Sequence, residues 1–238
     1  MLDLDSKQSV AAVDFGLASG TDSIPAGTWT LDGEDQLYIG LAYAPNSISQ
    51  IFVNLGSGKD AGQKSTSHAI GIKFSPAPME SAINMGLMLR ATQSTIDIDG
   101  LFWLHDISIS DAVNSYSVNA YVNGSEELKL TRLDAFIGAS SRTGVIRYYG
   151  GLCLSRIAGS DKIVLDDTAT VFSYPLAGGS GSSSTEDVTL AAKSDISGSH
   201  YIGGVLGLSI NPDSGMGMTF EIQEGIQRSV MLAGVLSF

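Results

Sequence analysis

Apolar residues recur at every second position along most of this chain, and this pattern constrains the fold more than any other feature. Successive side chains of a β-strand point to opposite faces, so a period of two residues predicts strands. Helical periodicity competes in none of these segments. We predict twelve strands, at residues 9–17, 36–44, 50–56, 67–74, 81–92, 101–109, 115–122, 128–139, 145–156, 200–210, 216–223 and 228–238.

The two faces of the predicted strands differ in charge. One face is uncharged, as in the segment that carries Leu37, Ile39, Leu41 and Tyr43. A transmembrane strand shows this pattern when its apolar face meets lipid and its polar face lines a lumen. A soluble β-sandwich shows the same alternation with the apolar face inside. The residues predicted to line a lumen are Lys73, Arg90, Arg132, Asp134, Arg147 and Glu221.

The last nine residues, Val-Met-Leu-Ala-Gly-Val-Leu-Ser-Phe, alternate and end on an aromatic side chain. This ending resembles the C-terminal signature of bacterial outer-membrane β-barrel proteins. The resemblance implies an all-β fold, a closed antiparallel transmembrane up-and-down barrel of about twelve strands, with ten or fourteen as alternatives. It also implies a Gram-negative outer membrane as the location. The barrel-assembly machinery would recognise Val230, Leu232, Leu236 and Phe238.

The predicted connections alternate in length. Five short ones lie at 45–49, 75–80, 110–114, 140–144 and 211–215, and six others, longer on the whole, lie at 18–35, 57–66, 93–100, 123–127, 157–199 and 224–227. Outer-membrane barrels have short periplasmic turns and longer outer loops. We therefore expect one domain over 1–238, with 157–199 a long extracellular loop or strand extension. A further hairpin there would give fourteen strands.

Aromatic residues on the apolar parity lie near the short turns and the C-terminus. Such side chains prefer the membrane interface, so we expect an aromatic girdle. Its members would be Tyr43, Phe74, Tyr116, Tyr148 and Phe238. The expected partners are then the lipid bilayer and lipopolysaccharide, with an oligomer or other envelope proteins also possible.

Composition narrows the remaining function classes. The net charge of −12 argues against a nucleic-acid partner, because phosphate is bound through clusters of Lys and Arg. No apolar run is long enough for a transmembrane helix. The acidic start lacks a secretory signal, so a signal peptide would already have been removed from an outer-membrane chain. The single cysteine, Cys153, permits no internal disulfide.

Catalytic and metal-binding motifs are not evident in the sequence. His68, His105 and His200 have no nucleophile or carboxylate at a catalytic spacing, so we expect no enzyme and no cofactor. Acidic residues in the predicted loops, as in the stretch Asp97 to Gly100, leave a divalent cation such as calcium open. The expected function is a narrow, porin-like passive diffusion channel or a structural membrane component. The alternative is a soluble secreted or assembly-forming β-sandwich that binds through its loops.

Overall fold

The computed structural model describes residues 2–6, 9–24, 28–31, 34–46, 48–60, 63–76, 83–210, 215–224 and 229–237. Nearly all of these residues lie in strands, and none lies in a helix. The strands are β1 (Leu2–Ser6), β2 (Ser9–Asp14), β3 (Ser19–Ile24), β4 (Thr28–Leu31), β5 (Glu34–Asn46), β6 (Ser49–Asp60), β7 (Gln63–Phe74), β8 (Ile83–Ser110), β9 (Asn114–Thr143), β10 (Ile146–Pro175), β11 (Ser182–Ile210), β12 (Gly215–Glu224) and β13 (Ser229–Ser237).

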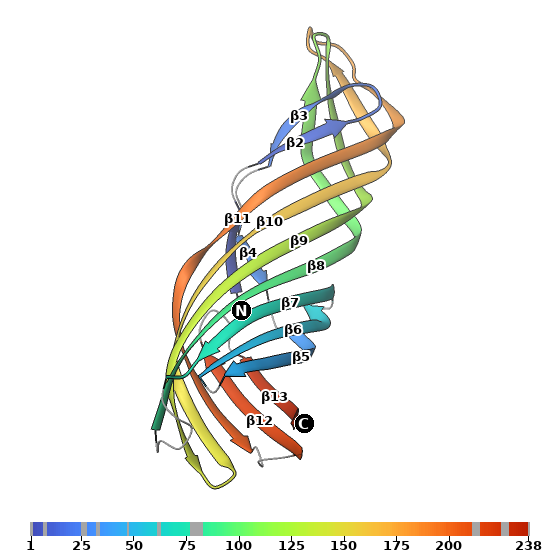
Figure 1. The fold of residues 1–238 in the computed structure, drawn as a ribbon. Coiled ribbons are helices and arrows are strands. Elements are labelled where there is room, and N and C mark those ends of the chain that lie inside the picture. The colour runs from blue at the N-terminus through green and yellow to red at the C-terminus, as the bar shows by residue number, and fades with distance from the viewer. Residues whose placement is uncertain are drawn as a thin grey trace.

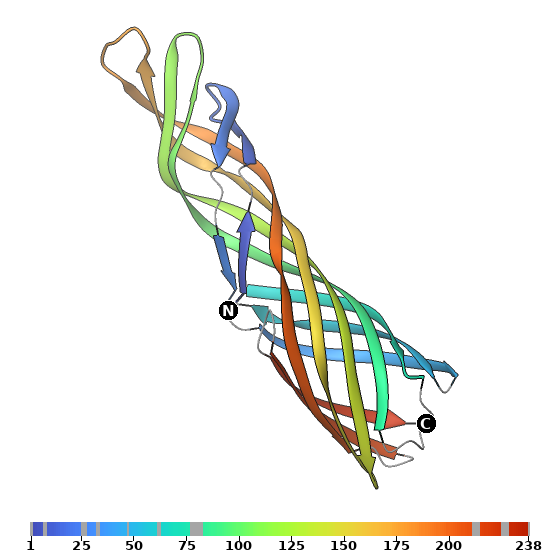
Figure 2. The same ribbon diagram turned by 90° about the vertical axis from the view of Figure 1, so that its left-hand side faces the viewer.

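All thirteen strands belong to one curved, twisted, antiparallel sheet (Figures 1 and 2). The main path runs β13-β12-β11-β10-β9-β8-β7-β6-β5, so β5 and β13 end it and do not pair with each other. The prediction of a closed barrel of about twelve strands is therefore wrong, because the described sheet is open. The N-terminal strands β1 and β2 pair with β11 instead of extending the path at either end.

Four strands are far longer than predicted. β8, β9, β10 and β11 have 28, 30, 30 and 29 residues. The segments 93–100 and 123–127, predicted as loops, are strand residues of β8 and β9, and residues 97–100 pair with 124–127, as Asp97 does with Glu127. The segment 157–199 forms the upper parts of β10 and β11 and their connecting turn (Figure 1).

Each long strand reverses the polarity of its two faces partway along its length. On β9 the odd-numbered side chains point to the outer face, and they change from polar to apolar between Thr131 and Leu133. The even-numbered side chains point to the inner face; from Val118 to Leu130 they are apolar apart from Glu126, and at Arg132 they become charged. β9 keeps its period of two across this boundary, whereas the ladder between β10 and β11 shifts register there, between Arg156 and Ala158.

The same boundary crosses the neighbouring strands. On β8 the outward residues change from apolar to polar between Ala91, which pairs with Leu133, and Gln93. On β10 the outward residues change between Leu154 and Arg156. Below the boundary the sheet therefore has an apolar outer face, which we call the band. Above it lies the extension, formed by the upper parts of β8 to β11 with β2 and β3.

The extension has an apolar interior of its own. β2 adds to β11, with Val13 opposite Leu190, and β3 approaches β8, where Asp22 accepts a hydrogen bond of 3.1 Å from the Ser108 amide. The hairpin thus covers the inner face of the long strands. The buried core that results contains Ala11, Val13, Phe15, Leu104, Ile109, Tyr116, Val118, Val122, Leu165, Ala169, Val171, Val188, Leu190 and Ala192.

Candidate polar site on the inner face

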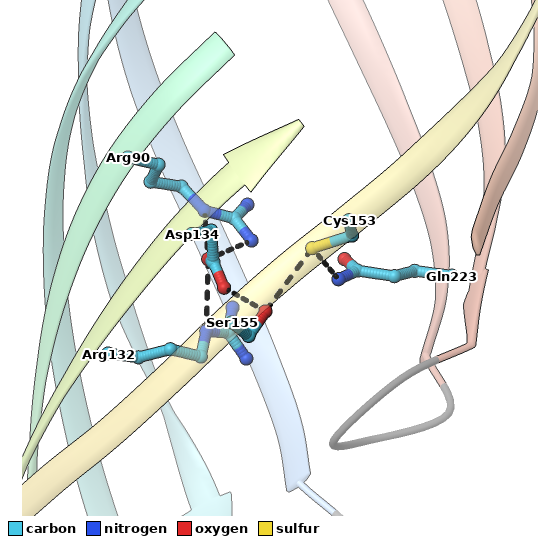
Figure 3. Close-up of polar contacts among 6 residues, drawn as sticks. All are labelled: Arg90, Arg132, Asp134, Cys153, Ser155 and Gln223. Carbon is cyan, nitrogen blue, oxygen red and sulfur yellow. Dashed lines mark hydrogen bonds and ion pairs between the residues drawn. The ribbon is translucent and has the colours of Figure 1, made fainter. Parts of the chain in front are cut away.

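A buried carboxylate, Asp134 of β9, lies at the centre of a polar cluster just below the boundary (Figure 3). Arg90 of β8 faces it in the ladder and donates from Nε and Nη2 to Oδ2, at 2.9 and 2.7 Å. Arg132, two residues away on the same face of β9, donates from Nε to the same oxygen at 3.1 Å. The Asp134 side chain has no exposed surface. Two guanidinium groups therefore share one carboxylate.

The other carboxylate oxygen begins a chain of hydrogen bonds that reaches β12 (Figure 3). The Ser155 hydroxyl donates to Asp134 Oδ1 at 2.6 Å. Because that donation uses the only hydroxyl proton of Ser155, the thiol of Cys153, 3.2 Å away, donates to the Ser155 oxygen. Gln223 Nε2 of β12 then donates to the Cys153 sulfur at 3.7 Å. The chain links three strands across the inner face.

A second contact joins β10 to β12 over a glycine. The Tyr149 hydroxyl donates to Glu221 Oε2 at 2.7 Å. Gly207 of β11 lies between these residues in register, and a Cβ there would overlap the Tyr149 ring. Gly71 of β7 likewise lies under the Phe52 ring. These two glycines accommodate neighbouring aromatic rings, which fill the space over them.

Curvature of the sheet brings charges from distant strands together. The Lys73 ammonium group lies 5.4 Å from the centre of the Phe52 ring, which favours a cation. It also interacts electrostatically with Glu221 of β12, Arg90 and Arg147. β7 and β12 are separated by four strands along the sheet. The six residues predicted to line a lumen therefore share one face and one concave region.

The chemistry of this cluster favours binding over catalysis. Its carboxylate is engaged by two arginines, so it is poorly placed to act as a base. Its thiol is a hydrogen-bond donor inside the sheet, whereas nucleophilic chemistry requires the thiolate. The four basic side chains Lys73, Arg90, Arg132 and Arg147 outnumber the two carboxylates Asp134 and Glu221. The inner face of the band is thus locally positive.

The aromatic residues predicted as a girdle do not all lie on one face. Tyr43, Phe74 and Tyr148 are exposed on the outer face. The assignment of Tyr116 to the girdle is wrong, because Tyr116 is only 7% exposed. Its hydroxyl donates to Asp111 in the turn at the far end of the extension. Its strand begins at that turn, and Tyr116 has the inward parity of β9. Phe238 lies outside the described residues.

The predicted assembly signal lies on the edge strand β13. Val230 and Leu232 are 66% and 69% exposed, on the outer face of the band. Leu236 belongs to β13 as well, although its side chain lies outside the described part, as does the whole of Phe238.

Sequence reasoning missed four residues of the polar network: Tyr149, Cys153, Ser155 and Gln223. Tyr149, Cys153 and Ser155 share the inward parity of Arg147 on β10, which was a usable signal. The strand register that brings them to Asp134 and Glu221 was not available from a single sequence.

No metal site emerges from the side chains that the structure describes, since no three of their His, Cys, Asp and Glu residues lie together suitably. Asp97 and Asp99 belong to β8 and not to a loop. Among the described residues, no helix is long and apolar enough to cross a membrane. No family model, curated protein or solved structure matches the chain.

Proposed function

We propose that this chain is an integral protein of a bacterial outer membrane, with the band in contact with lipid and the inner face providing a narrow polar route for small anionic solutes. The observation that carries the proposal is the reversal of polarity at one level of the sheet. Above that level the apolar face is inside and dry, and below it the apolar face is outside and exposed. Water above and hydrocarbon below would stabilise this arrangement.

The size of the band supports lipid contact. Leu37, Leu41, Ile202 and Leu206 are 76%, 79%, 76% and 71% exposed, on strands across the width of the sheet. Exposed apolar surfaces of this extent mark a membrane or a protein interface. On β10 the apolar outer positions run from Ile146 to Leu154. At about 3.4 Å per residue this is ~27 Å of strand, close to the ~25 Å apolar girdle of outer-membrane proteins before strand tilt is counted.

The inner face supports the choice of solute. Its four basic groups and two carboxylates leave an excess of positive charge in a chain whose net charge is −12. A concave, partly desolvated surface of one sign raises the local concentration of ions of the opposite sign. Small anions are therefore the favoured solutes on electrostatic grounds.

The open edges add a requirement to the proposal. Within the described residues β5 pairs only with β6, and β13 only with β12. Unpaired backbone groups are not tolerated in hydrocarbon. The band can therefore lie in a bilayer only if protein strands, as in an assembly of several copies, cover these edges.

Vesicle reconstitution tests membrane insertion and solute passage separately. The full chain should float with lipid vesicles and resist alkaline extraction, and Ile137→Arg in the band should lower the inserted fraction. Ser125→Arg, on the same face of the same strand in the extension, is the matched control and should insert normally. Inserted protein should then give a reversal potential in a salt gradient that indicates anion preference. Equal behaviour of the two variants would contradict the membrane proposal, and cation preference would contradict the anion route.

One observation favours the alternative function for part of the chain. The extension has an apolar core and mostly polar outer positions, with the exposed Leu101, Trp103 and Tyr121 as exceptions, and a soluble β-sandwich is built in this way. Its two turns are joined where the Leu176 amide donates to the Val113 carbonyl at 2.8 Å. If the whole chain stays soluble in buffer without lipid or detergent, assembly through the band between copies becomes the better account.

A further inference from the structure

Two buried carboxyl groups face the interior of the extension, apart from the polar site below the boundary. Glu126 of β9 and Asp161 of β10 are 5% and 3% exposed. They are diagonal neighbours across the ladder, since Glu126 pairs with Ile163 and Asp161 with Leu128. The charge of Asp161 acts on Glu126, so the two carboxyl groups lie close together. Two neighbouring carboxyl groups can hydrogen-bond to each other only if one of them carries a proton.

Among the inward side chains that the structure describes, no compensating positive charge faces the pair. The inward residues that flank the pair are Ile98 on β8, Ile163 on β10, and Ser194 on β11 opposite Asp161. Buried apolar clusters lie on both sides, one around Leu128 and Ile96 and the other around Leu165 and Val122. Within the described part of the chain, Asp161 is the charged group that acts on Glu126. Among the described residues, the next ionisable groups with an inward register are Arg132 on β9, Asp167 on β10 and Tyr201 on β11.

Each carboxyl group also keeps one oxygen unpaired. Glu126 Oε1 and Asp161 Oδ1 are buried and have no hydrogen-bond partner among the described residues. A buried carboxylate without cation or donor is costly, whereas a protonated one costs much less. We propose that Glu126 and Asp161 bind a shared proton and act as a proton-dependent latch that holds β9 against β10 in the extension.

The electrostatics give the direction of the pH response. Burial, and next the charge of Asp161, raise the pKa of Glu126 from 4.5 to about 8, and burial raises the pKa of Asp161 as well. In the unfolded chain both groups ionise near their ordinary values. The folded extension therefore holds more protons than the unfolded chain between pH ~4.5 and ~8, so its stability falls as pH rises through this window. Above about pH 8 the latch is released.

Infrared spectroscopy tests the shared proton directly on the full chain. The absorption of a protonated, hydrogen-bonded carboxyl group should be present at pH 7, disappear above pH 9, and be absent at pH 7 in Glu126→Gln. Glu127→Gln is the matched control, because the adjacent Glu127 is exposed and paired with Lys129 at 2.8 Å. Absence of a protonated carboxyl signal in the wild-type chain at pH 7 would overturn the proposal.

Amide hydrogen exchange tests the latch itself. After correction for intrinsic rates, residues 118–130 and 157–167 should exchange at least tenfold faster at pH 9 than at pH 6 in the wild-type chain. Glu126→Gln should show little change, because its amide donates to Asp161 at every pH, and Glu127→Gln should behave as wild type. A pH-independent wild type, or protection restored at pH 9 by calcium or magnesium, would overturn the proton latch, the second result in favour of a cation site.

Discussion

Thr131 and Leu133 are consecutive outward residues of β9, and the outer surface of the sheet changes from polar to apolar between them. On the inner face, one residue away, the side chains change from apolar to charged between Leu130 and Arg132. A soluble sheet would reverse both faces at one level only if other protein covered the apolar outer face below that level. A sheet that leaves a bilayer and continues into water needs no such cover, because its outer surroundings change there.

Removal of the central carboxylate should destabilise the band. Asp134→Asn leaves Arg90 and Arg132, whose side chains are 19% and 24% exposed, without their shared counter-ion. Loss of one partner from a buried ion pair typically costs about 3–5 kcal/mol, and the partial exposure of the arginines favours the lower end. Urea unfolding from detergent micelles measures the change. The control variant Glu127→Gln breaks the exposed ion pair with Lys129, and it should change the free energy of unfolding by less than about 1 kcal/mol. Equal effects would contradict the central role of Asp134.

A methyl group at Gly207 should disturb the contact between β10 and β12. The new Cβ overlaps the Tyr149 ring, so the ring must move away from Glu221. Overpacking of this kind costs about 1–3 kcal/mol. Thermal unfolding of Gly207→Ala should show this loss. Gly100→Ala is the control because its Cβ meets no atom within 4 Å. A Gly207→Ala variant as stable as that control would show that Tyr149 does not need the glycine.

Truncation of Phe15 should loosen the hairpin from the extension. Phe15 has no exposed surface and packs in the core that β2 and β3 close. Removal of a buried aromatic side chain costs about 3–5 kcal/mol. Limited proteolysis should cleave residues 9–24 faster in Phe15→Ala than in the wild type. Leu17→Ala, at a side chain that is 45% exposed, should leave the rate unchanged. Unchanged cleavage of Phe15→Ala would mean that the hairpin is held in another way.

The edge strands should acquire partners in a bilayer. β5 and β13 each have one described neighbour, so half of their backbone groups lack a strand partner within the described sheet. Hydrocarbon does not replace those hydrogen bonds. In vesicles, amides on both edges of β5 should therefore exchange slowly, and crosslinking should capture neighbouring protein. Fast exchange along one edge of an inserted β5 would contradict the requirement that protein strands cover both edges of the sheet.

Local periodicity predicted the all-β class and the parity of the inner-face residues, because a period of two assigns each side chain to a face. Arg90 and Asp134 were correctly placed on the same face. Long-range pairing was not predictable in the same way. The hydrogen bonds from Ser155 and Gln223 depend on a register between strands that are distant in the sequence.

The division of β8 and β9 into two predicted strands each has one cause, whereas β1, β3 and β4 lie outside every predicted strand. Above the boundary, outward residues of β8 such as Gln93 and Asp97 are polar, so this part of the continuous strand has the composition of a loop. The turn at 110–114 was predicted to lie at the same end of the barrel as the turn at 140–144. Tyr116 was assigned to the girdle because it lies next to that turn. Because β8 and β9 continue through the boundary, the two turns lie at opposite ends of β9.

Spin-label accessibility in reconstituted vesicles tests whether the band contacts lipid. In a Cys153→Ser background, single labels at Ile137→Cys and Lys129→Cys lie on the outer face of β9, below and above the boundary. The account predicts that the label at 137 collides with lipid-soluble oxygen and is shielded from a water-soluble nickel chelate, and that the label at 129 shows the opposite. Equal access of the nickel chelate to both labels would contradict contact between the band and lipid.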